Sequence, residues 1–478
     1  MVADRLELCR LDADLAERSG DGKRAQRLLE RGARVIDRYR ERLTALDLRV
    51  GASALGAGIA RSGLRLAVQD GDAEGVLRWA DRTRAGALRV AESGPIDSGL
   101  VGELGRLRAL EQRLAQVSAR PMEIARLARE AREIEETIRR RSRARGRAGA
   151  RRPGGDVSRL RALPAGKTLL QLVETDDGRL LAIRARDGRV SLHELGDRAR
   201  REASSSQLGL ALARVGGARD VESRLRATRR VEAIASELVA GCPVDGAGGR
   251  AALLVLVPSS AFLSVPWAIV PELVGAALSV APSAATWLEL DGRARAAATK
   301  PSVVVVGPRL RGASSEVSVI ASVTGGRPLA GADARVDRVL AAMDGARIAH
   351  FACHGHFRAD APLFSSLELY DGPLNVYDLQ QLKRPPGMVV LSACDLGLSE
   401  ARPGDELLGM ATALLAMGTR TVIASVIPIP DRIARKVMVA FHTHLVGGKR
   451  PAEALALAQA ALPPRDRIFA GFVCIGAG

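Results

Sequence analysis

Four short apolar runs in the second half of the chain constrain its fold most strongly. They read SVVVVG, ARIAHFACHG, GMVVLSACD and TRTVIASVIPIPD, at residues 302–307, 346–355, 387–395 and 419–431. None of them alternates apolar with polar residues, and segments of helical periodicity separate them. Continuous β-branched runs of this kind are typical of strands that helices cover on both faces, as in a parallel α/β sheet. We therefore predict an open, mostly parallel sheet with flanking helices over residues 301–478.

The preceding segment, residues 161–300, predicts further strands. From Lys167 the sequence KTLLQLVETDDGRLLAIRARDGRVSLHEL has a period of two and contains two Asp-Gly pairs. This pattern is typical of three antiparallel strands joined by tight turns. A helix is predicted over residues 220–240, and the apolar run AALLVLVP follows it at 251–258.

Residues 1–97 are predicted to be helical, because apolar and small residues recur at intervals of three and four. Two stretches echo each other at an offset of 51 residues: LAERSGDGKRAQRLLERG begins at Leu15 and LAVQDGDAEGVLRWADRT at Leu66. In each, a Gly-Asp turn follows one helix, and its Asp can cap the next. The pattern resembles degenerate tetratricopeptide repeats, whose usual period is about 34 residues, and an ordinary helical bundle is the alternative.

Residues 98–160 are predicted to form one or two long charged helices and a linker. Pro121 predicts a break or a helix start. Eight arginines follow between Arg139 and Arg152, where Gly and Pro also gather. We interpret this run as a solvated linker, with a patch for nucleic acid or an acidic partner as the alternative.

The formal charge of +17 does not by itself predict a nucleic-acid partner. Only six of the 71 basic residues are lysine, and the chain is also rich in Ala, Gly, Leu and Val, a bias that the GC-rich codons of a high-GC bacterium explain. Aromatic residues make up only 3% of the chain, whereas nucleic-acid platforms need aromatic rings for stacking. Nucleic acid is therefore not favoured as a partner.

Cysteine usage and hydropathy bear on the compartment. Five scattered cysteines do not indicate a disulfide framework in a chain of 478 residues. The first twenty residues lack the apolar core of a signal peptide, and no apolar run is long enough to span a bilayer. We expect a cytoplasmic protein with reduced thiols and no membrane partner.

Two of the predicted strands end in residues that suit nucleophilic catalysis. His354-Gly355 closes one run, and Cys394-Asp395 closes another forty positions after the histidine. Ligands bind at the carboxyl ends of the strands in open parallel sheets, and this spacing suffices for one crossover between neighbouring strands. We therefore expect the imidazole and the thiol to face one cleft, where a thiolate can attack a carbonyl and the imidazole can transfer the protons.

These motifs resemble the CHAT family of caspase-like cysteine peptidases, in the clan that contains caspases, gingipains and separases. The resemblance rests on HFACHGHF, PLFSSLELYDG, VVLSACDLG and GDELLGMATALLAMGTRTVIASVIPIPD, in this order. Upstream, SVPWAIVP and VAPSAATWL fit the same pattern, as does the C-terminal PAEALALAQAAL. The similarity covers residues 160–478 well and the N-terminal helices loosely.

The resemblance implies roles for three residues. Cys394 matches the nucleophile of the family, His354 matches its catalytic imidazole, and the backbone amides of Gly355 and Cys394 match its oxyanion hole. Such preorganised N–H donors stabilise a developing oxyanion without reorganisation. The resemblance also implies that residues 161–300 form a non-catalytic caspase-like half and residues 301–478 the catalytic half.

Acidic residues downstream of Cys394 are candidates for the substrate pocket. Asp395 follows the nucleophile directly, and Asp405 and Glu406 follow the loop SEARPG. An acidic group here could select a basic substrate residue, as others do in this clan; alternatively, Asp405 caps the predicted helix ELLGMATALLAMG. Ser365 is predicted to lie in the turn before the next strand and is a further pocket candidate.

The remaining side chains of HFACHGHF are expected to have structural roles. We expect Cys353 to be a small buried residue, His350 to support the site from the core and His356 to be a loop residue at the cleft rim. A zinc site made of the three histidines is not favoured, because His350 lies about 6 to 7 Å down the pleat from the strand end. No metal or other cofactor is expected.

The sequence thus predicts a cysteine endopeptidase with a Cys394–His354 dyad that cleaves a protein or peptide substrate in regulated bacterial proteolysis or defence signalling. The helices of residues 1–97 offer a surface for a regulatory protein. The alternative is a catalytically inactive scaffold that uses a degenerate caspase fold and helical repeats for protein–protein interaction. The presence of both dyad residues favours the enzyme.

Overall fold

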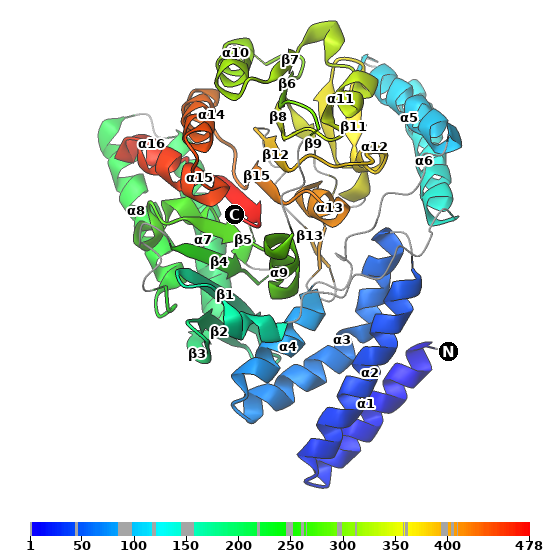
Figure 1. Cartoon of the computed structure of the whole chain (residues 1–478), viewed down its shortest axis with the longest axis vertical. Coiled ribbons are helices and arrows are strands. Elements are labelled where there is room, and N and C mark those ends of the chain that lie inside the picture. Colours follow the sequence, from blue (N-terminus) through cyan, green and yellow to red (C-terminus); the bar gives the residue numbers. More distant parts are fainter. Residues whose placement is uncertain are drawn as a thin grey trace.

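A computed structural model of the chain describes residues 2–43, 46–84, 98–116, 121–144, 157–217, 220–244, 252–259, 262–263, 265–293, 299–310, 313–356, 358, 362–392, 400–402, 406–408 and 410–478. Within these residues, an α-helical N-terminal part precedes an α/β part built on one large sheet (Figure 1). None of the helices in these ranges combines the length and the apolar character that a bilayer span needs.

The N-terminal part begins with helices that pack in sequence order. Their bounds are α1 (Val2–Arg18), α2 (Gly22–Arg42), α3 (Leu46–Gln69) and α4 (Ala73–Arg84). The predicted helix pairs are present, and Asp21 caps α2 as expected, since its carboxylate accepts a 2.9 Å hydrogen bond from the Arg24 N–H. The relation to tetratricopeptide repeats stays a prediction.

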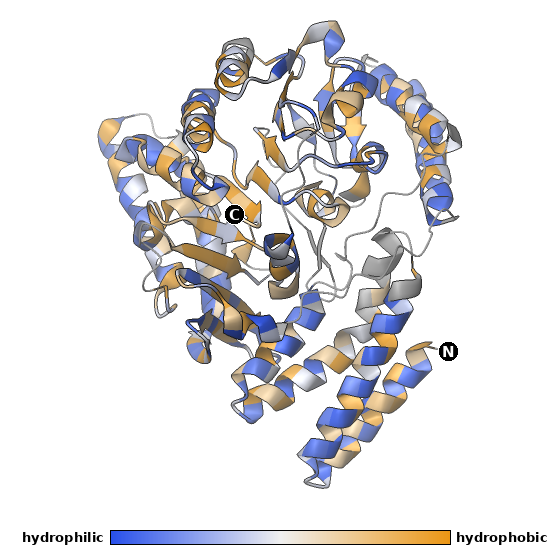
Figure 2. Cartoon of the chain, in the orientation of Figure 1, coloured by the Kyte–Doolittle hydropathy of each residue, from blue (hydrophilic) through white to orange (hydrophobic). Residues whose placement is uncertain are grey.

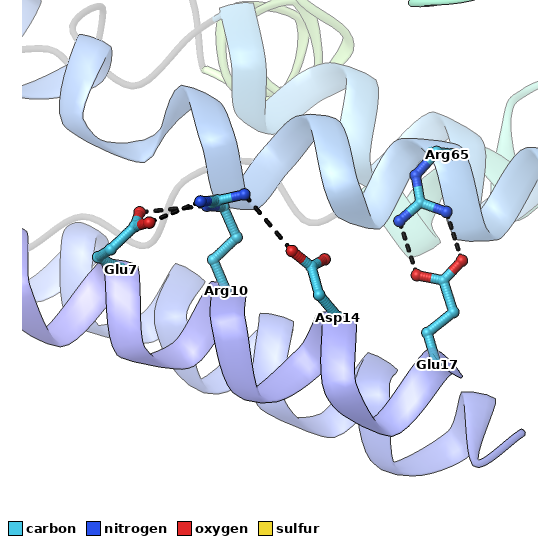
Figure 3. Close-up of polar contacts among 5 residues, drawn as sticks. All are labelled: Glu7, Arg10, Asp14, Glu17 and Arg65. Carbon is cyan, nitrogen blue, oxygen red and sulfur yellow. Dashed lines mark hydrogen bonds and ion pairs between the residues drawn. The ribbon is translucent and has the colours of Figure 1, made fainter. Parts of the chain in front are cut away.

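Ion pairs connect α1 to α3 and also form along α1 itself (Figure 3). The Arg65 guanidinium of α3 donates to both carboxylate oxygens of Glu17, one of them at 2.7 Å. Along α1 itself, Arg10 pairs with Glu7 at 2.5 Å and with Asp14 at 3.4 Å. The Arg65 side chain is 40% exposed, so this pair orients α1 and α3 more than it stabilises them.

Two further helices follow, α5 (Ser98–Gln116) and α6 (Pro121–Ala144), and they pack against each other. We call them the α5–α6 hairpin. Pro121 is the first residue of α6, as the sequence predicts, because the first turn of a helix does not need its missing N–H. Figure 1 shows the hairpin in cyan against the upper part of the α/β core.

The α/β core is a single sheet, with eleven strands among the described residues, that spans both predicted halves. Its strands, in spatial order, are β3 (Arg189–Asp197), β2 (Arg179–Arg186), β1 (Lys167–Glu174), β4 (Leu253–Val257), β5 (Leu278–Val280), β16 (Phe472–Gly476), β15 (Thr421–Ser425), β12 (Met388–Leu391), β8 (Ile348–Ala352), β6 (Val303–Val306) and β7 (Arg327–Leu329). The four apolar runs form β6, β8, β12 and β15, as predicted. The predicted meander forms β1 to β3.

Nine of these strands form two parallel blocks that run in opposite directions. The C-terminal block contains the mutually parallel strands β15, β12, β8, β6 and β7, and the N-terminal block contains β16, β5, β4 and β1. Strands β2 and β3 extend the sheet beyond β1 by antiparallel pairing. The blocks meet where β15 and β16 pair antiparallel, from Thr421 opposite Gly476 to Ser425 opposite Phe472. The carboxyl ends of the strands in one block therefore point in the direction opposite to those in the other block.

The turn between β2 and β3 shows why the meander could be predicted from the sequence. Asp187 and Gly188 both have positive φ, at 49° and 78°. Two consecutive positive φ angles are the signature of a type I′ turn, which favours Asp-Gly.

Helices cover both faces of the sheet (Figure 1). One face carries α10 (Ala313–Thr324), α14 (Asp431–Val446) and α15 (Pro451–Ala460), and the other carries α9 (Ala284–Gly292), α11 (Val336–Met343) and α13 (Met410–Met417). The strands are largely orange in Figure 2, and β8 and β12 are buried at every position. Burial on both faces confirms the prediction made from the unalternating runs.

Further helices complete the described chain. The predicted helix after the meander is α8 (Val221–Val239), which packs against a helix that was not predicted, α7 (Arg198–Gly217). The short helix α16 (Pro464–Arg467) precedes β16. Short 3-10 helices are η1 (Val157–Ala162), η3 (Trp267–Ile269), η4 (Pro271–Leu273), η5 (Gly331–Asp333) and η6 (Pro362–Phe364).

A small sheet lies beyond the end of β8. It contains β9 (Gly355–His356), β10 (Ser366–Leu369) and β11 (Gly372–Asn375) in the order β11-β10-β9, and the short helix α12 (Val376–Leu379) follows it. These elements occupy the predicted crossover between β8 and β12.

The segment before α13 differs from the prediction. Glu406–Leu408 forms strand β14, which pairs with β13 (Glu400–Arg402), and α13 begins only at Met410. The predicted helix start at Glu406 is wrong, because pairing with β13 takes up these residues. Asp405, the predicted cap of this helix, lies outside the described residues.

Candidate active site

The strand that leads to His354 lies beside the strand that leads to Cys394. β8 and β12 are parallel neighbours, with Phe351 opposite Leu391. The pairing continues one residue further, since the Ser392 N–H donates to the Phe351 carbonyl at 2.8 Å. His354 follows Phe351 by three positions, and Cys394 follows Leu391 by three. The expected adjacency of the two strands is confirmed, whereas Cys394 itself lies outside the described residues.

His354 is exposed, and the small sheet fixes its main chain. Strand β8 ends two residues earlier, and the His354 carbonyl accepts a 2.8 Å hydrogen bond from the Glu368 N–H. Gly355 then pairs with Leu367 of β10. His356 is also exposed but belongs to β9 rather than to a loop. The imidazole of His354 is thus carried on an anchored backbone at the carboxyl edge of the C-terminal block.

Gly307 packs against the base of this segment. It follows β6 directly, and its N–H donates to the Ala352 carbonyl at 2.8 Å. A Cβ atom on Gly307 would lie 2.4 Å from Cys353 Cβ and 2.8 Å from the Glu368 carbonyl oxygen, far inside van der Waals contact. The absence of a side chain therefore lets β6, the His354 segment and β10 come together.

Cys353 has the buried position that the sequence predicts. It is 2% exposed, and burial raises the pKa of its thiol, an effect that the nearby Glu368 carboxylate increases. The thiol is therefore protonated at neutral pH and unsuited to nucleophilic attack.

His350 is also buried, on the face of the sheet that α10 and α14 cover. Its Nδ1 lies 3.1 Å from Nε2 of His442, and its Nε2 lies 3.7 Å from the Glu316 carboxylate. Burial, followed by the neighbouring His350, lowers the pKa of His442 well below its usual value, so that ring stays neutral at pH 7. Because His354 and His356 are exposed, the structure does not bring the three histidines of HFACHGHF together.

Of the three acidic pocket candidates, only Glu406 belongs to the described residues. Asp395 and Asp405 fall outside it, and Glu406 belongs to β14. Their roles in a substrate pocket stay predictions. Among the described residues, no group of three or more His, Cys, Asp or Glu side chains is arranged to hold a metal ion.

Ser365 lies directly before β10, as predicted, but it is fully buried. Its Oγ accepts a 3.1 Å hydrogen bond from the Arg358 N–H. Ser365 therefore supports the segment between β9 and β10, and its expected place in a substrate pocket gains no support from this position.

Sequence reasoning missed Arg358 and Gly307. The Arg358 guanidinium binds Glu135 of α6 at 2.5 Å, across 223 residues of sequence. Gly307 is one of 49 glycines, and nothing in its neighbourhood marks it. A local pattern carries no signal for either contact.

The fold defines the class of protein as caspase-like α/β. The chain superposes on Saccharomyces cerevisiae separase, in two crystal structures of its complex with securin, over 95% of its length with TM-scores of 0.50 and 0.51 and identities of 8% and 9%. It spans 37% of the length of the separase chain. The Arg-specific cysteine proteinase gingipain R also matches, with a TM-score of 0.34 and 11% identity over 54% of this chain and 68% of that one.

The chain belongs to the CHAT domain family, because a model of that family matches residues 219–477, more than half of its length. This finding confirms the family that the motifs around His354 and Cys394 indicate. A comparison with curated proteins finds no match.

Proposed function

We propose that the protein is a CHAT-type cysteine endopeptidase that cleaves a protein substrate, with Cys394 as its nucleophile and His354 as its proton-transfer group. The observation that carries the proposal is the parallel pairing of β8 with β12, since these two strands lead to His354 and Cys394 at one edge of the sheet. Membership of the CHAT family supports the same function. Its cellular setting is proposed to be regulated bacterial proteolysis or defence signalling.

In the first half of the reaction, the Cys394 thiolate attacks the scissile carbonyl carbon, and a C–S bond forms. The backbone N–H groups of Gly355 and Cys394 stabilise the resulting oxyanion. The intermediate then collapses, the C–N bond breaks, and the His354 imidazolium gives its proton to the leaving amine. An acyl-enzyme and a free amine result.

In the second half, His354 accepts a proton from water, and the resulting hydroxide attacks the acyl carbon. The C–S bond breaks, the Cys394 thiolate is regenerated and the carboxylic acid leaves. Both halves need the imidazole on a fixed backbone, which the pairing of Gly355 with Leu367 supports.

The regions of the chain have separate roles in this proposal. Residues 301–478 form the catalytic half, and residues 161–300 form a non-catalytic half that braces it, which the pairing of β5 with β16 supports. Residues 98–160 connect this part to the helices of residues 1–97, where a regulatory protein binds. The separase structures contain securin as a protein partner.

Cleavage of a diverse pool of internally quenched peptides, followed by mass spectrometry, tests the proposal. Wild type is expected to cleave a subset of the peptides, and Cys394→Ala none. His354→Ala is expected to lose a factor of about 100 or more in rate, because it lacks the group that moves the protons. His356→Ala is the matched control, since this exposed histidine lies two residues away, and its rate is expected to stay within about twofold of wild type.

Equal rates for His354→Ala and His356→Ala would remove the imidazole from the mechanism, and activity in Cys394→Ala would remove the thiol. A folded wild type that cleaves no peptide and no candidate protein would favour the scaffold alternative.

A further inference from the structure

The α5–α6 hairpin contacts the small sheet at two points. At the first, Arg108 of α5 donates to the Pro373 carbonyl at 3.1 Å and to Asp378 Oδ1 at 3.0 Å. Asp378 is 1% exposed and forms a capping box with Asn375 at the start of α12. Gly372, at the β10–β11 turn, makes room for the arginine, because a Cβ atom there would lie 2.4 Å from Arg108 Cγ.

At the second point, Arg358 binds Glu135 of α6. The two guanidinium nitrogens lie 2.5 and 3.5 Å from the two carboxylate oxygens. The Glu135 side chain is only 7% exposed. The Phe364 ring lies 5.7 Å from the Arg358 guanidinium and 5.3 Å from that of Arg139. The Arg358 side chain is 31% exposed, so water screens this charge-assisted, bidentate pair less than it screens a fully exposed one.

A short path of hydrogen bonds leads from Arg358 to His354. The Arg358 N–H donates to Ser365 Oγ at 3.1 Å. The next residue, Ser366, pairs with His356 in the small sheet. Gly355, adjacent to His354, pairs one step further along the same strand. The segment that carries His354 is therefore tied through Arg358 to a helix more than 200 residues earlier in the chain.

We propose that Arg358 and Glu135 are positioning residues for the active site: their ion pair ties the His354–Gly355 segment to α6. The catalytic consequence rests on the proposed function, whereas the tie itself involves only described residues. Neither residue needs to touch the substrate. Loss of the ion pair misplaces the imidazole and the Gly355 N–H, and a small misplacement of reacting groups lowers the catalytic rate strongly.

Two further charged groups lie near Glu135. Arg139 Nη2 lies 3.6 Å from Glu135 Oε2, and the carboxylate of Glu111 in α5 is close enough to interact unfavourably with that of Glu135. Removal of Arg358 therefore leaves Glu135 with less positive charge in a largely buried position, which drives the hairpin and the loop apart.

Two glutamate variants on α6 test the tie. Glu135→Gln removes the charge at the contact, and Glu133→Gln makes the same change at an exposed position on the same helix. Hydrogen exchange of residues 354–369, measured in the full-length protein, reports on the tie. The rate of inactivation by a thiol-reactive peptidyl electrophile reports on the active site. For Glu135→Gln we expect exchange to be about tenfold faster and the maximal inactivation rate about tenfold slower, with the half-saturating concentration of the electrophile unchanged.

Two substitutions of Arg358 separate a positioning role from a structural one. Arg358→Lys keeps one charged donor and is expected to restore part of the inactivation rate that Arg358→Met loses. Identical exchange and inactivation in Glu135→Gln and Glu133→Gln would overturn the inference. If the electrophile does not react with wild type, the proposed function fails instead, and exchange alone then decides the tie: faster exchange in Glu135→Gln supports it, and unchanged exchange overturns it.

Discussion

Gly307 shows how one residue without a side chain shapes the candidate site. In Gly307→Ala, the new methyl group would meet Cys353 and the Glu368 carbonyl at less than 3 Å, and the backbone there must move. We expect a loss of about 1 to 3 kcal/mol in the free energy of unfolding, because overpacking strains a core, and a lower catalytic rate, because Cys353 precedes His354. Urea denaturation and peptide cleavage measure the two effects.

The control for this change is Gly209→Ala in α7, where no atom lies within 4 Å of the new Cβ. It is expected to be neutral or slightly stabilising, since alanine favours helix more than glycine does. Equal stability of the two variants would show that the close contact at Gly307 relaxes without cost.

At the residue scale, the candidate catalytic residues could be predicted from the sequence, but the contacts that position them could not. His354 and Gly355 stood out because an apolar run ends at them, and Cys353 was correctly expected to be buried. The supporting contacts of Gly307 and Arg358 depend on which segments meet in space. Which segments contact each other depends on the strand order, which a single sequence does not reveal.

At the scale of elements, the docking of the α5–α6 hairpin is expected to depend on pH through Glu111. Burial, and next the nearby Glu135, raises the pKa of Glu111 to about 7, while Arg358 and Arg108 lower it and Asp378 raises it. Between about pH 4.5 and 7 the carboxylate ionises in the unfolded chain but not in the folded one. The contribution of Glu111 to the free energy of unfolding is therefore fully present below about pH 4.5 and is lost as the pH rises to about 7, by an amount on the order of 2 to 3 kcal/mol.

Thermal unfolding of Glu111→Gln at pH 5 and pH 8 measures this effect. Because glutamine cannot ionise, we expect the variant to match wild type at pH 5 and to unfold at a higher temperature at pH 8. Glu133→Gln, at its exposed position, is expected to show no such difference. A shift of the same size at both pH values would remove ionisation of Glu111 as the cause.

Long or strongly patterned elements were predicted, and short or ambiguous ones were not. The meander was predicted because its period and its Asp-Gly turns agree with each other. Helix α7 contains three consecutive serines at 204–206, which are poor signals for a helix. Strand β5 has only three residues, too few for a period to be recognised.

At the scale of the whole molecule, α4 links the N-terminal helices to the sheet. Its Arg84 side chain is 3% exposed and donates to the carbonyls of Val257 at 3.2 Å, Pro258 at 2.9 Å and Leu172. These carbonyls lie toward the carboxyl ends of β4 and β1. The Arg84 side chain therefore lies at the carboxyl ends of β4 and β1.

Arg84→Met is expected to destabilise the fold by about 2 to 4 kcal/mol, since buried carbonyls lose a charged donor. Denaturant unfolding measures the loss, and hydrogen exchange in β1 and β4 is expected to become faster. Arg78→Met, at an exposed position of the same helix, is the control and is expected to change stability by less than about 0.5 kcal/mol. Equal effects of the two variants would contradict this account of α4.

The opposite directions of the two strand blocks could not be predicted, because an apolar run reveals a strand but not its direction. The sequence did support the expectation that residues 161–300 extend the sheet, and the pairing of β5 with β16 confirms it. The reversal occurs at β16, whose neighbours β5 and β15 are 141 residues apart, from Val280 to Thr421.

The site of covalent labelling distinguishes the proposed nucleophile from the other thiols of the protein. The 478-residue chain is treated with a thiol-reactive peptidyl electrophile, digested and mapped by tandem mass spectrometry, with the half-buried Cys9 and Cys242 as internal references. We expect Cys394 to be modified far faster than either reference, and we expect His354→Ala, but not His356→Ala, to slow its modification. Labelling of Cys394 no faster than of Cys9, unaffected by His354→Ala, would contradict the proposed dyad.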